Sequence, residues 1–408
     1  MIFKDRFLKH NILMFFSTTL TNLANFLYQL LIVRKLAIAS YGVFNSLLSL
    51  FMIFSLPLAS LSTMIAKFTS SYNNVDERKK VDALLSVMLR HMGFIAIFFL
   101  ALYLVFAFCL KDYLRLDSIV PIHLTGFMLT LTILSTVTFG GLQGLERFAW
   151  FSVSSISTGV SKLVLTLLFL SLGWDLVGAL GGYLGAQIIG LFLCLYPLKK
   201  IFYIRHKGID IDIKEKYKFV VPTLVTLGVS ALVTNIDMVL VKHFFNSSEA
   251  GYYSIAQLIG KMVLFMPSAV YIVILPRASG LNAQKKDSRF LLKKGLRYTA
   301  FLSGLVLVVY NLFPVFMLKI LTGKVTAQII LLGRFFAVAM FFFSLVAVLI
   351  LYQLSISRFT FLKNLVVLGI LEIIAILIFH SSLFQVVSVL ILTSLTLFIL
   401  NLKSAFKD

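Results

Sequence analysis

The sequence has few charged residues and almost no cysteine. Only 13% of its 408 residues are charged, about half the share that the surface of a soluble globular protein carries. Its two cysteines, Cys109 and Cys194, form neither a closely spaced pair nor a metal-binding pattern, so no disulfide framework is expected. Because 60% of the residues are apolar and the mean hydropathy is +1.00, the composition is typical of a polytopic, all-α membrane protein.

Acidic residues are scarcer still. The chain has 16 Asp and Glu against 37 Lys and Arg, a net charge of +21. Such an excess could indicate nucleic-acid binding, but here the basic residues lie in loops between apolar runs, as in the cytoplasmic loops of membrane proteins. We therefore expect membrane lipids, and no nucleic acid, as partners. No cleavage site with small residues follows the first apolar run, so we expect that run to be retained as a span.

Runs of about 20 apolar residues predict twelve membrane spans. The last two are short and separated only by residues 380–382, so a tight helical hairpin is favoured over one broken span. The predicted spans are 11–33, 42–66, 84–110, 119–141, 150–172, 176–198, 219–241, 251–275, 298–318, 325–352, 364–379 and 383–401.

The distribution of Lys and Arg predicts the orientation. The termini and even-numbered loops hold 26 of the 37 basic residues, the odd-numbered loops hold 7, and 4 lie within spans. Since short cytoplasmic loops are the ones enriched in Lys and Arg, this asymmetry predicts that both termini are cytoplasmic.

The two halves of the chain share a repeat. Gly42 in a Tyr-Gly-Val-Phe run corresponds to Gly251 in an Ala-Gly-Tyr-Tyr run at an offset of 209, and Pro57 corresponds to Pro267 at 210. The repeat predicts an N-lobe (1–205) and a C-lobe (206–408) of six spans each, joined by the charged stretch at about 199–218. Because six is even, both halves enter the membrane from the same side, and we expect them to form a parallel repeat. Since substrate sites lie at the interface of such repeats, we also expect spans one, two, seven and eight, with their polar residues, to face a central cavity.

The first helix with its Asn and Thr residues, followed by Arg34-Lys35-Leu36, Tyr41-Gly42-Val43-Phe44 and Leu56-Pro57-Leu58, resembles the Wzx-type polysaccharide-export flippases. These belong to the multidrug/oligosaccharidyl-lipid/polysaccharide (MOP) superfamily. The resemblance implies a V-shaped, two-lobed transporter in the cell (inner) membrane. It would move an oligosaccharide linked to undecaprenyl diphosphate to the outer leaflet, alongside a polysaccharide polymerase or other export machinery.

Ionisable residues inside predicted spans are candidates for function, because a charge at the bilayer centre costs at least about 2.5–3.5 kcal/mol. Arg90 lies so close to the end of its span that it could instead reach the cytoplasmic surface. The basic candidates outnumber the acidic ones, which suits an anionic substrate such as a diphosphate. The acids are candidates for ion coupling or for pairing with a base. The bases are Arg90, Lys162, Lys261 and Arg334, and the acids are Asp237 and Glu372.

Polar residues at helical spacing accompany these charges. Bonding between helices could explain such stripes, and for the glycines of span six we favour that packing interpretation. For spans one, five, seven and eight the recurrence of long amide and charged side chains favours a water-lined cavity. The substrate-binding candidates that these stripes add are Asn22, Asn25 and Gln29 of span one and Tyr253 and Gln257 of span eight.

Several motifs of enzymes are missing from the sequence. It has no phosphate-binding glycine loop, zinc-protease pattern or nucleophile elbow, so we expect no enzyme activity, no cofactor and no metal. Asp210-Ile-Asp212 resembles a sugar-transferase motif but stands alone in the charged linker. A cation-coupled multidrug exporter and a peptidoglycan-precursor flippase stay open as alternatives. A polysaccharide polymerase or ligase is disfavoured, because no substantial outer loop is predicted.

Overall fold

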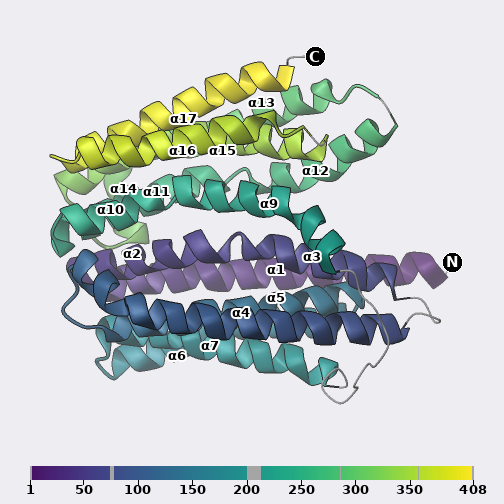
Figure 1. Cartoon of the computed structure of the whole chain (residues 1–408). Helices are drawn as coiled ribbons and strands as arrows, with labels where there is room; N and C mark the ends of the chain where they lie inside the picture. The colour runs from purple at the N-terminus through teal and green to yellow at the C-terminus, as the bar shows by residue number, and fades with distance from the viewer. Residues whose placement is uncertain (1, 74–77, 200–212, 285, 357, 407–408) are drawn as a thin grey trace. The chain divides into compact units, whose positions relative to one another are not determined.

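The computed structural model describes residues 2–73, 78–199, 213–284, 286–356 and 358–406. Throughout these residues the regular structure is helical, as a bilayer requires, because only helices and closed barrels satisfy every backbone polar group without water. The protein is an all-α polytopic membrane protein (Figure 1). In chain order the helices are α1 (Ile2–Lys35), α2 (Ile38–Ser55), α3 (Leu58–Ser71), α4 (Arg78–Tyr113), α5 (Val120–Gly144), α6 (Phe148–Ser171), α7 (Asp175–Leu195), the short 3-10 helix η2 (Tyr196–Leu198), α9 (Ile213–Val233), α10 (Ile236–Phe244), α11 (Ser247–Phe265), α12 (Ser268–Ala283), α13 (Arg289–Leu312), α14 (Pro314–Leu321), α15 (Ala327–Ser355), α16 (Thr360–Ile378) and α17 (Leu383–Phe406).

Ten helical stretches in the described residues are long and apolar enough to span a membrane. The other two predicted spans, 11–33 and 251–275, coincide with α1 and with α11 and the start of α12. These helices carry the polar stripes that the sequence predicted, and the stripes lower their mean hydropathy. Twelve spans therefore remain consistent with the structure.

The repeat prolines mark matching helix breaks. Pro57 is the N-cap of α3 and separates it from α2, and Met266 and Pro267 separate α11 from α12. Proline cannot donate a backbone hydrogen bond, so it is tolerated at a helix start and disfavoured further inside. A third break, at Thr234 and Asn235, divides α9 from α10, whereas the first helix of the chain runs unbroken from Ile2 to Lys35.

The structure changes the bounds of the ninth predicted span and decides between the two alternatives for the last two spans. The ninth span, expected at 298–318, is helix α13 (Arg289–Leu312), because Pro314 starts a separate helix, α14. The last two spans form the favoured hairpin. Thr360 and Ser404 are hydrogen-bonded at 2.7 Å, and Asn364 donates to Asn401 at 3.2 Å, so α16 and α17 run antiparallel.

The described residues form two compact units. The amino-terminal unit comprises residues 1–36 and 46–231, and the carboxyl-terminal unit comprises 37–45 and 232–408. Each unit thus includes a short piece of the other half of the sequence. Most of the predicted linker at 199–218, with Asp210 and Asp212, lies outside the described residues.

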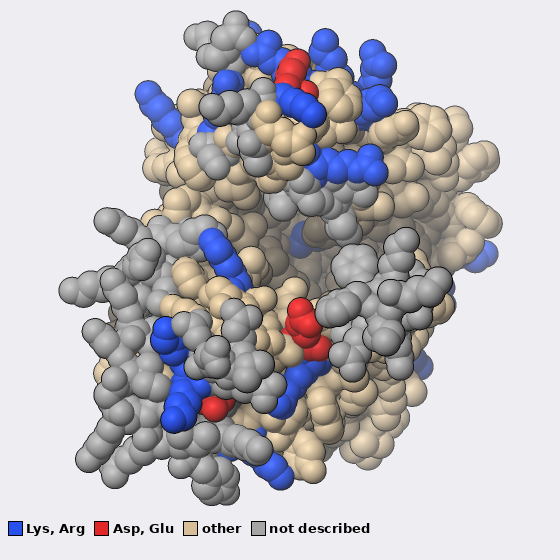
Figure 2. Space-filling model, turned by 90° about the vertical axis from the view of Figure 1, so that its right-hand side faces the viewer, with Lys and Arg blue, Asp and Glu red and all other residues tan. Residues whose placement is uncertain are grey.

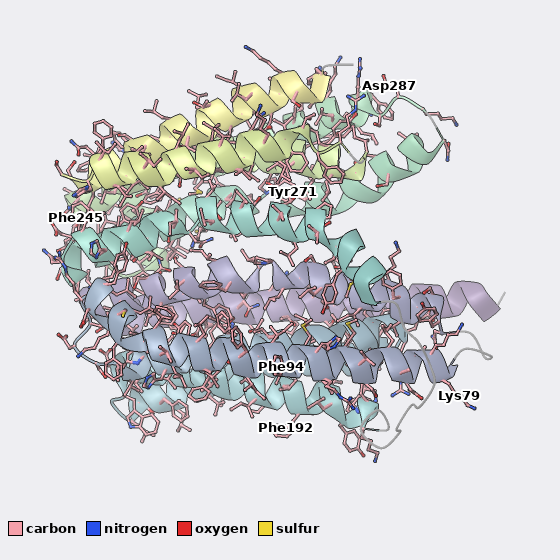
Figure 3. All side chains as sticks on the ribbon, in the orientation of Figure 1. Lys79, Phe94, Phe192, Phe245, Tyr271 and Asp287 are labelled. Atoms are coloured by element: carbon pink, nitrogen blue, oxygen red, sulfur yellow. The ribbon has the colours of Figure 1, made fainter. Side chains whose placement is uncertain are left out.

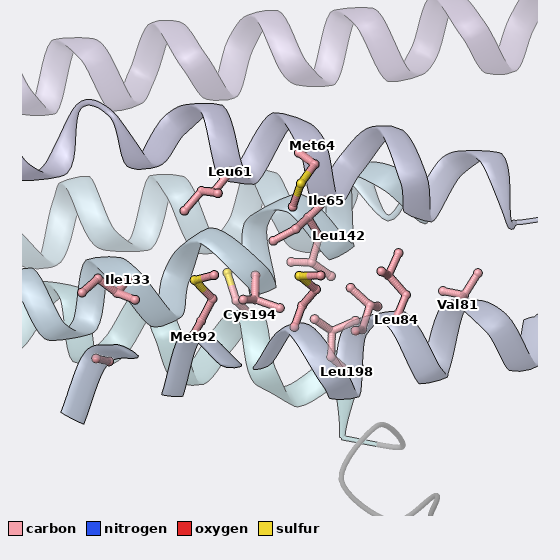
Figure 4. Close-up of a cluster of buried hydrophobic side chains, with 14 of the residues drawn as sticks. Leu61, Met64, Ile65, Val81, Leu84, Met92, Ile133, Leu142, Cys194 and Leu198 are labelled. Atoms are coloured by element: carbon pink, nitrogen blue, oxygen red, sulfur yellow. The ribbon is translucent and has the colours of Figure 1, made fainter. Parts of the chain in front are cut away.

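The core of the amino-terminal unit is an apolar cluster contributed by several helices (Figure 4). Leu61 and Met64 of α3, Met92 of α4 and Ile133 of α5 pack together there, and Val220 of α9 joins the same cluster. Long apolar side chains also cover the outside of this unit. Phe94 of α4 and Phe192 of α7, both labelled in Figure 3, are more than two-thirds exposed, as is expected of side chains that face lipid.

Close helix crossings in each unit depend on glycine. In the carboxyl-terminal unit the start of α2 packs on α11, where a Cβ on Gly251 would lie 2.1 Å from the carbonyl oxygen of Ile38. A Cβ on Gly42 would lie 2.6 Å from the backbone nitrogen of Gly251. In the amino-terminal unit a Cβ on Gly182 would meet Thr166 of α6, which agrees with the packing interpretation of the glycines of span six.

Candidate functional site

Lys162 lies at the centre of a polar cluster in the amino-terminal unit. It is on α6, is only 7% exposed, and its Nζ donates a hydrogen bond to Oδ1 of Asn25 on α1. The same Nζ lies 4.5 Å from the ring centroid of Tyr28 and 4.5 Å from that of Tyr183. Ammonium groups at such distances are attracted to the negative faces of aromatic rings.

The two rings of this cage are themselves held in place. The Tyr28 hydroxyl donates to the carbonyl oxygen of Ala179 on α7 at 3.1 Å. The ring centroids of Tyr28 and Tyr183 are 5.9 Å apart with an edge-to-face orientation, and the ring of Phe51 also packs on Tyr183, with the centroids 5.6 Å apart. A Cβ on Gly159, one turn before Lys162, would lie 3.1 Å from Cβ of Ala24. The glycine therefore brings α1 and α6 close enough for Lys162 to reach Asn25.

A second cluster lies in the carboxyl-terminal unit, around the helix break at Asn235. Asn235 is the N-cap of α10, but its side chain does not cap that helix. Instead its Oδ1 accepts a hydrogen bond from Nζ of Lys261 at 3.1 Å. The break places Asp237 in the first turn of α10, where the partial positive charge of the helix N-terminus favours a carboxylate.

Three residues of α11, spaced by four, contact Asn235 or Asp237 at this helix break. The Tyr253 hydroxyl donates to Oδ2 of Asp237 at 2.9 Å, and Nε2 of Gln257 donates to the same atom at 3.1 Å. Lys261, one turn further along, makes the contact with Asn235. Asn45 of α2 donates to Oε1 of Gln257 at 2.8 Å. The predicted stripe on span eight is therefore one face of a helix that surrounds Asp237.

Glu372 of α16 is the second acid of this cluster. It is 1% exposed, and neither of its carboxylate oxygens has a hydrogen-bond partner among the described residues. It lies within electrostatic range of Asp237 and Tyr253. Two buried carboxylates that interact repel each other unless a proton or a cation neutralises one of them. Within the described part of the chain, no group of three or more His, Cys, Asp or Glu gathers as a metal site.

The remaining predicted site residues lie outside these clusters. Arg90 on α4, Arg334 on α15 and Asn22 on α1 are exposed, and Gln29 is half-buried. Lys242, which the predicted spans place in a loop, is buried in α10 and only 1% exposed. The two clusters thus contain seven of the eleven candidates and leave Arg90, Arg334, Asn22 and Gln29 outside.

Four residues of the clusters were not predicted. Tyr28 and Tyr183 could not be distinguished among many aromatic residues, and Asn45 lies in a helix with no other long polar side chain. Asn235 had a usable signal, because an asparagine two residues before an acid interrupts an otherwise apolar run and asparagine favours N-cap positions.

Known proteins match both the sequence and the fold. The family model for polysaccharide biosynthesis proteins matches residues 7–282, about two-thirds of the chain. The chain belongs to this polysaccharide biosynthesis family. A relative, an uncharacterized membrane protein of Methanocaldococcus jannaschii, is 26% identical over 294 residues, which cover 69% of this chain and 68% of the relative.

Members of the MOP superfamily share the fold. The lipid II flippase MurJ in an inward closed conformation matches with a TM-score of 0.75 and 15% identity, covering 98% of this chain and 88% of its own. A multidrug-resistance MATE transporter of the superfamily, facing inward, matches at 0.71 and 15% identity, covering 95% and 94%. A MOP transporter of Pyrococcus furiosus, whose description mentions a binding pocket of reversed polarity, matches at 0.57 and 15% identity, covering 97% and 94%. The polysaccharide biosynthesis family member described here therefore has the MOP transporter fold.

Proposed function

We propose that the protein is a flippase that moves an undecaprenyl-diphosphate-linked oligosaccharide from the inner to the outer leaflet by alternating access. The observation that carries this function is the buried, caged Lys162 in a unit whose predicted spans contain no Asp or Glu. Such a unit has cationic character at membrane depth, which suits an anionic headgroup. The match to the polysaccharide biosynthesis family supports a saccharide-bearing substrate.

The lysines are the proposed contacts of the diphosphate. Lys162 and Lys261 each keep an ammonium at membrane depth, held by an asparagine oxygen. An ammonium can exchange such a neutral acceptor for a phosphate oxygen, because charge-assisted hydrogen bonds are roughly twice as strong as neutral ones. The exposed Arg90, close to the cytoplasmic end of its predicted span, is proposed to attract the headgroup before it reaches these sites. The exposed Arg334, nearer the outer end of its predicted span, is proposed to contact the headgroup afterwards.

The acid pair is the proposed coupling site. Asp237 accepts hydrogen bonds from Tyr253 and Gln257, whereas the carboxylate of Glu372 has no hydrogen-bond partner within the described part of the chain. A proton or a monovalent cation that binds at Glu372 would relieve the repulsion between the two carboxylates. Release and uptake of that cation would then bias the conformational equilibrium, because the two states differ in their affinity for it.

The membrane itself supplies a driving force. A diphosphate carries at least two negative charges, and an inside-negative potential favours their outward movement by about 2.3 kcal/mol per charge per 100 mV. The protein then needs no ATP, in keeping with the absence of a phosphate-binding loop from the sequence.

We also propose that both termini are cytoplasmic. Lys and Arg gather on the face drawn in Figure 2, with few Asp and Glu among them.

A test of this function compares substrates in proteoliposomes. A fluorescent lipid-linked oligosaccharide, the lipid-linked peptidoglycan precursor and a lipophilic cationic drug are offered in turn, each with and without an imposed potential or ion gradient. We expect the oligosaccharide to be moved fastest, at a rate that responds to the potential or to a cation gradient. Preferred movement of the drug would support the multidrug-exporter alternative, and preferred movement of the precursor would support the peptidoglycan alternative. A rate that ignores both potential and gradients would contradict the proposed driving force.

A further inference from the structure

The two polar clusters occupy corresponding positions of the repeat. Lys162 and Glu372 are 210 residues apart, Tyr28 and Asp237 are 209 apart, and these offsets are the ones set independently by the glycine and proline pairs. Lys162 and Glu372 lie on the corresponding helices α6 and α16, and the helices around them correspond as well. Helices α1, α6 and α7 pack together in one unit, as α10, α16 and α17 do in the other.

These corresponding positions carry opposite charges. In the carboxyl-terminal unit, the broken helix and α16 place two carboxylates at the position. In the amino-terminal unit, α1 is unbroken, the position of Asp237 holds Tyr28, and the position of Glu372 holds Lys162. Where one unit has acids able to hold a cation, the other has a cation already in place, with two tyrosine rings and an asparagine oxygen around it.

We propose that the Lys162 ammonium is a tethered cation, and that Asn25, Tyr28 and Tyr183 form an ammonium-binding site which the lysine side chain fills. The part of this proposal that rests on the proposed function is that the acids of the carboxyl-terminal unit bind a soluble cation. The ammonium site itself rests on the geometry of the cage. Tyr28 and Tyr183 are then positioning residues for Lys162, and the amino-terminal unit keeps its positive charge throughout the cycle without taking up an ion.

This assignment predicts what the site binds when the tether is removed. Lys162→Ala deletes three methylene groups and the ammonium, which together correspond to n-propylammonium. Aromatic cages recognise alkylammonium ions through their ring faces, so the vacated site should take up this ion and discriminate against Na⁺, which is strongly hydrated. It should also discriminate against n-propanol, which has the same chain length and no charge.

The test is thermal unfolding of purified, full-length protein in detergent with added n-propylammonium chloride. For Lys162→Ala we expect a saturable rise of roughly 2 °C or more in Tm, and no such rise with NaCl or n-propanol. Wild type should not respond, because its site is filled. Lys162→Met, which fills the space without a charge, is the matched control and should not respond either. Lys162→Ser provides the same measurement if the alanine variant does not fold.

A second substitution in the Lys162→Ala protein tests whether n-propylammonium binds between the tyrosine rings. Added to Lys162→Ala, Tyr28→Phe should keep the response because the ring face remains, and Tyr28→Leu should abolish it. The proposal is overturned if the folded Lys162→Ala and Lys162→Ser proteins show no saturable shift, or if Lys162→Met shifts equally. Because this readout involves no transport, it decides the ammonium site even if wild type moves no lipid-linked oligosaccharide. A failure of wild type to move lipid-linked oligosaccharide would refute only the proposed flippase function.

Discussion

Lys162 and Lys261 each donate a hydrogen bond to an asparagine side chain, but their other surroundings differ. Lys162 is held by an asparagine and two aromatic rings, with no acid among its partners in the described residues. Lys261 is held by Asn235 and also interacts electrostatically with Asp237. Lys261 is therefore the base that balances part of the negative charge of the acid pair, and it is expected to respond when a cation or a diphosphate arrives.

Substitutions of Lys261 test its charge. We expect Lys261→Ala to lower the rate of transport about tenfold or more while expression and folding stay near normal, because each 1.4 kcal/mol of lost interaction is a factor of ten and hydrogen bonds to charged groups are worth about 1.5–3 kcal/mol. Lys261→Arg should retain more activity than Lys261→Gln, since it keeps the positive charge. The measurement is flux in proteoliposomes at matched protein content. Equal activity of Lys261→Ala and wild type would refute the role, and a loss that Arg rescues no better than Gln would indicate packing instead.

At the scale of helices, two features position the carboxyl-terminal cluster. The break between α9 and α10 puts Asp237 at a helix N-terminus, and the crossing of α2 over α11 puts Asn45 beside Gln257. The crossing depends on Gly42 and Gly251, which leave no room for a Cβ. The glycine pair identified from the repeat is thus a contact between the two repeated segments themselves.

Alanine substitutions test this crossing. We expect Gly251→Ala to destabilise the protein by about 1–3 kcal/mol or more, because its Cβ would lie 2.1 Å from a backbone oxygen of Ile38 and the backbone would have to move. Gly93→Ala is the matched control, since a Cβ there meets nothing within 4 Å, and it should be neutral. Thermal unfolding in detergent measures both. Equal Tm values for the two variants would show that the crossing tolerates a side chain.

At the scale of the whole molecule, the membrane class and the all-helical fold could be predicted because they depend on composition and periodicity. The stripe of Tyr253, Gln257 and Lys261 could be predicted for the same reason, since a spacing of four puts residues on one face of a helix. The partners across each cluster could not be predicted. The contacts of Tyr183 with Lys162 and of Asn45 with Gln257 join residues distant in sequence, and only tertiary packing brings them together.

Charge alone also failed to separate buried from exposed candidates. Arg90 and Arg334 lie in apolar runs as Lys162 does, yet they are exposed. A long basic side chain near the end of a span can keep its charged group at the membrane surface, and the sequence does not show on which side of a helix a neighbouring helix packs. Depth along the span was informative for Arg90, and helix orientation was the missing information for Arg334.

We propose that this protein moves a saccharide-bearing lipid across the membrane. The most direct measurement is the leaflet distribution of the lipid-linked saccharide in cells that make it, with and without this protein. A membrane-impermeant reagent that attacks sugars is applied to intact cells and to inside-out vesicles. We predict that the saccharide is reached on the outer face of intact cells only when the protein is present, and that it accumulates on the cytoplasmic face, accessible in inside-out vesicles, when the protein is absent. The same distribution in both cases would contradict the account.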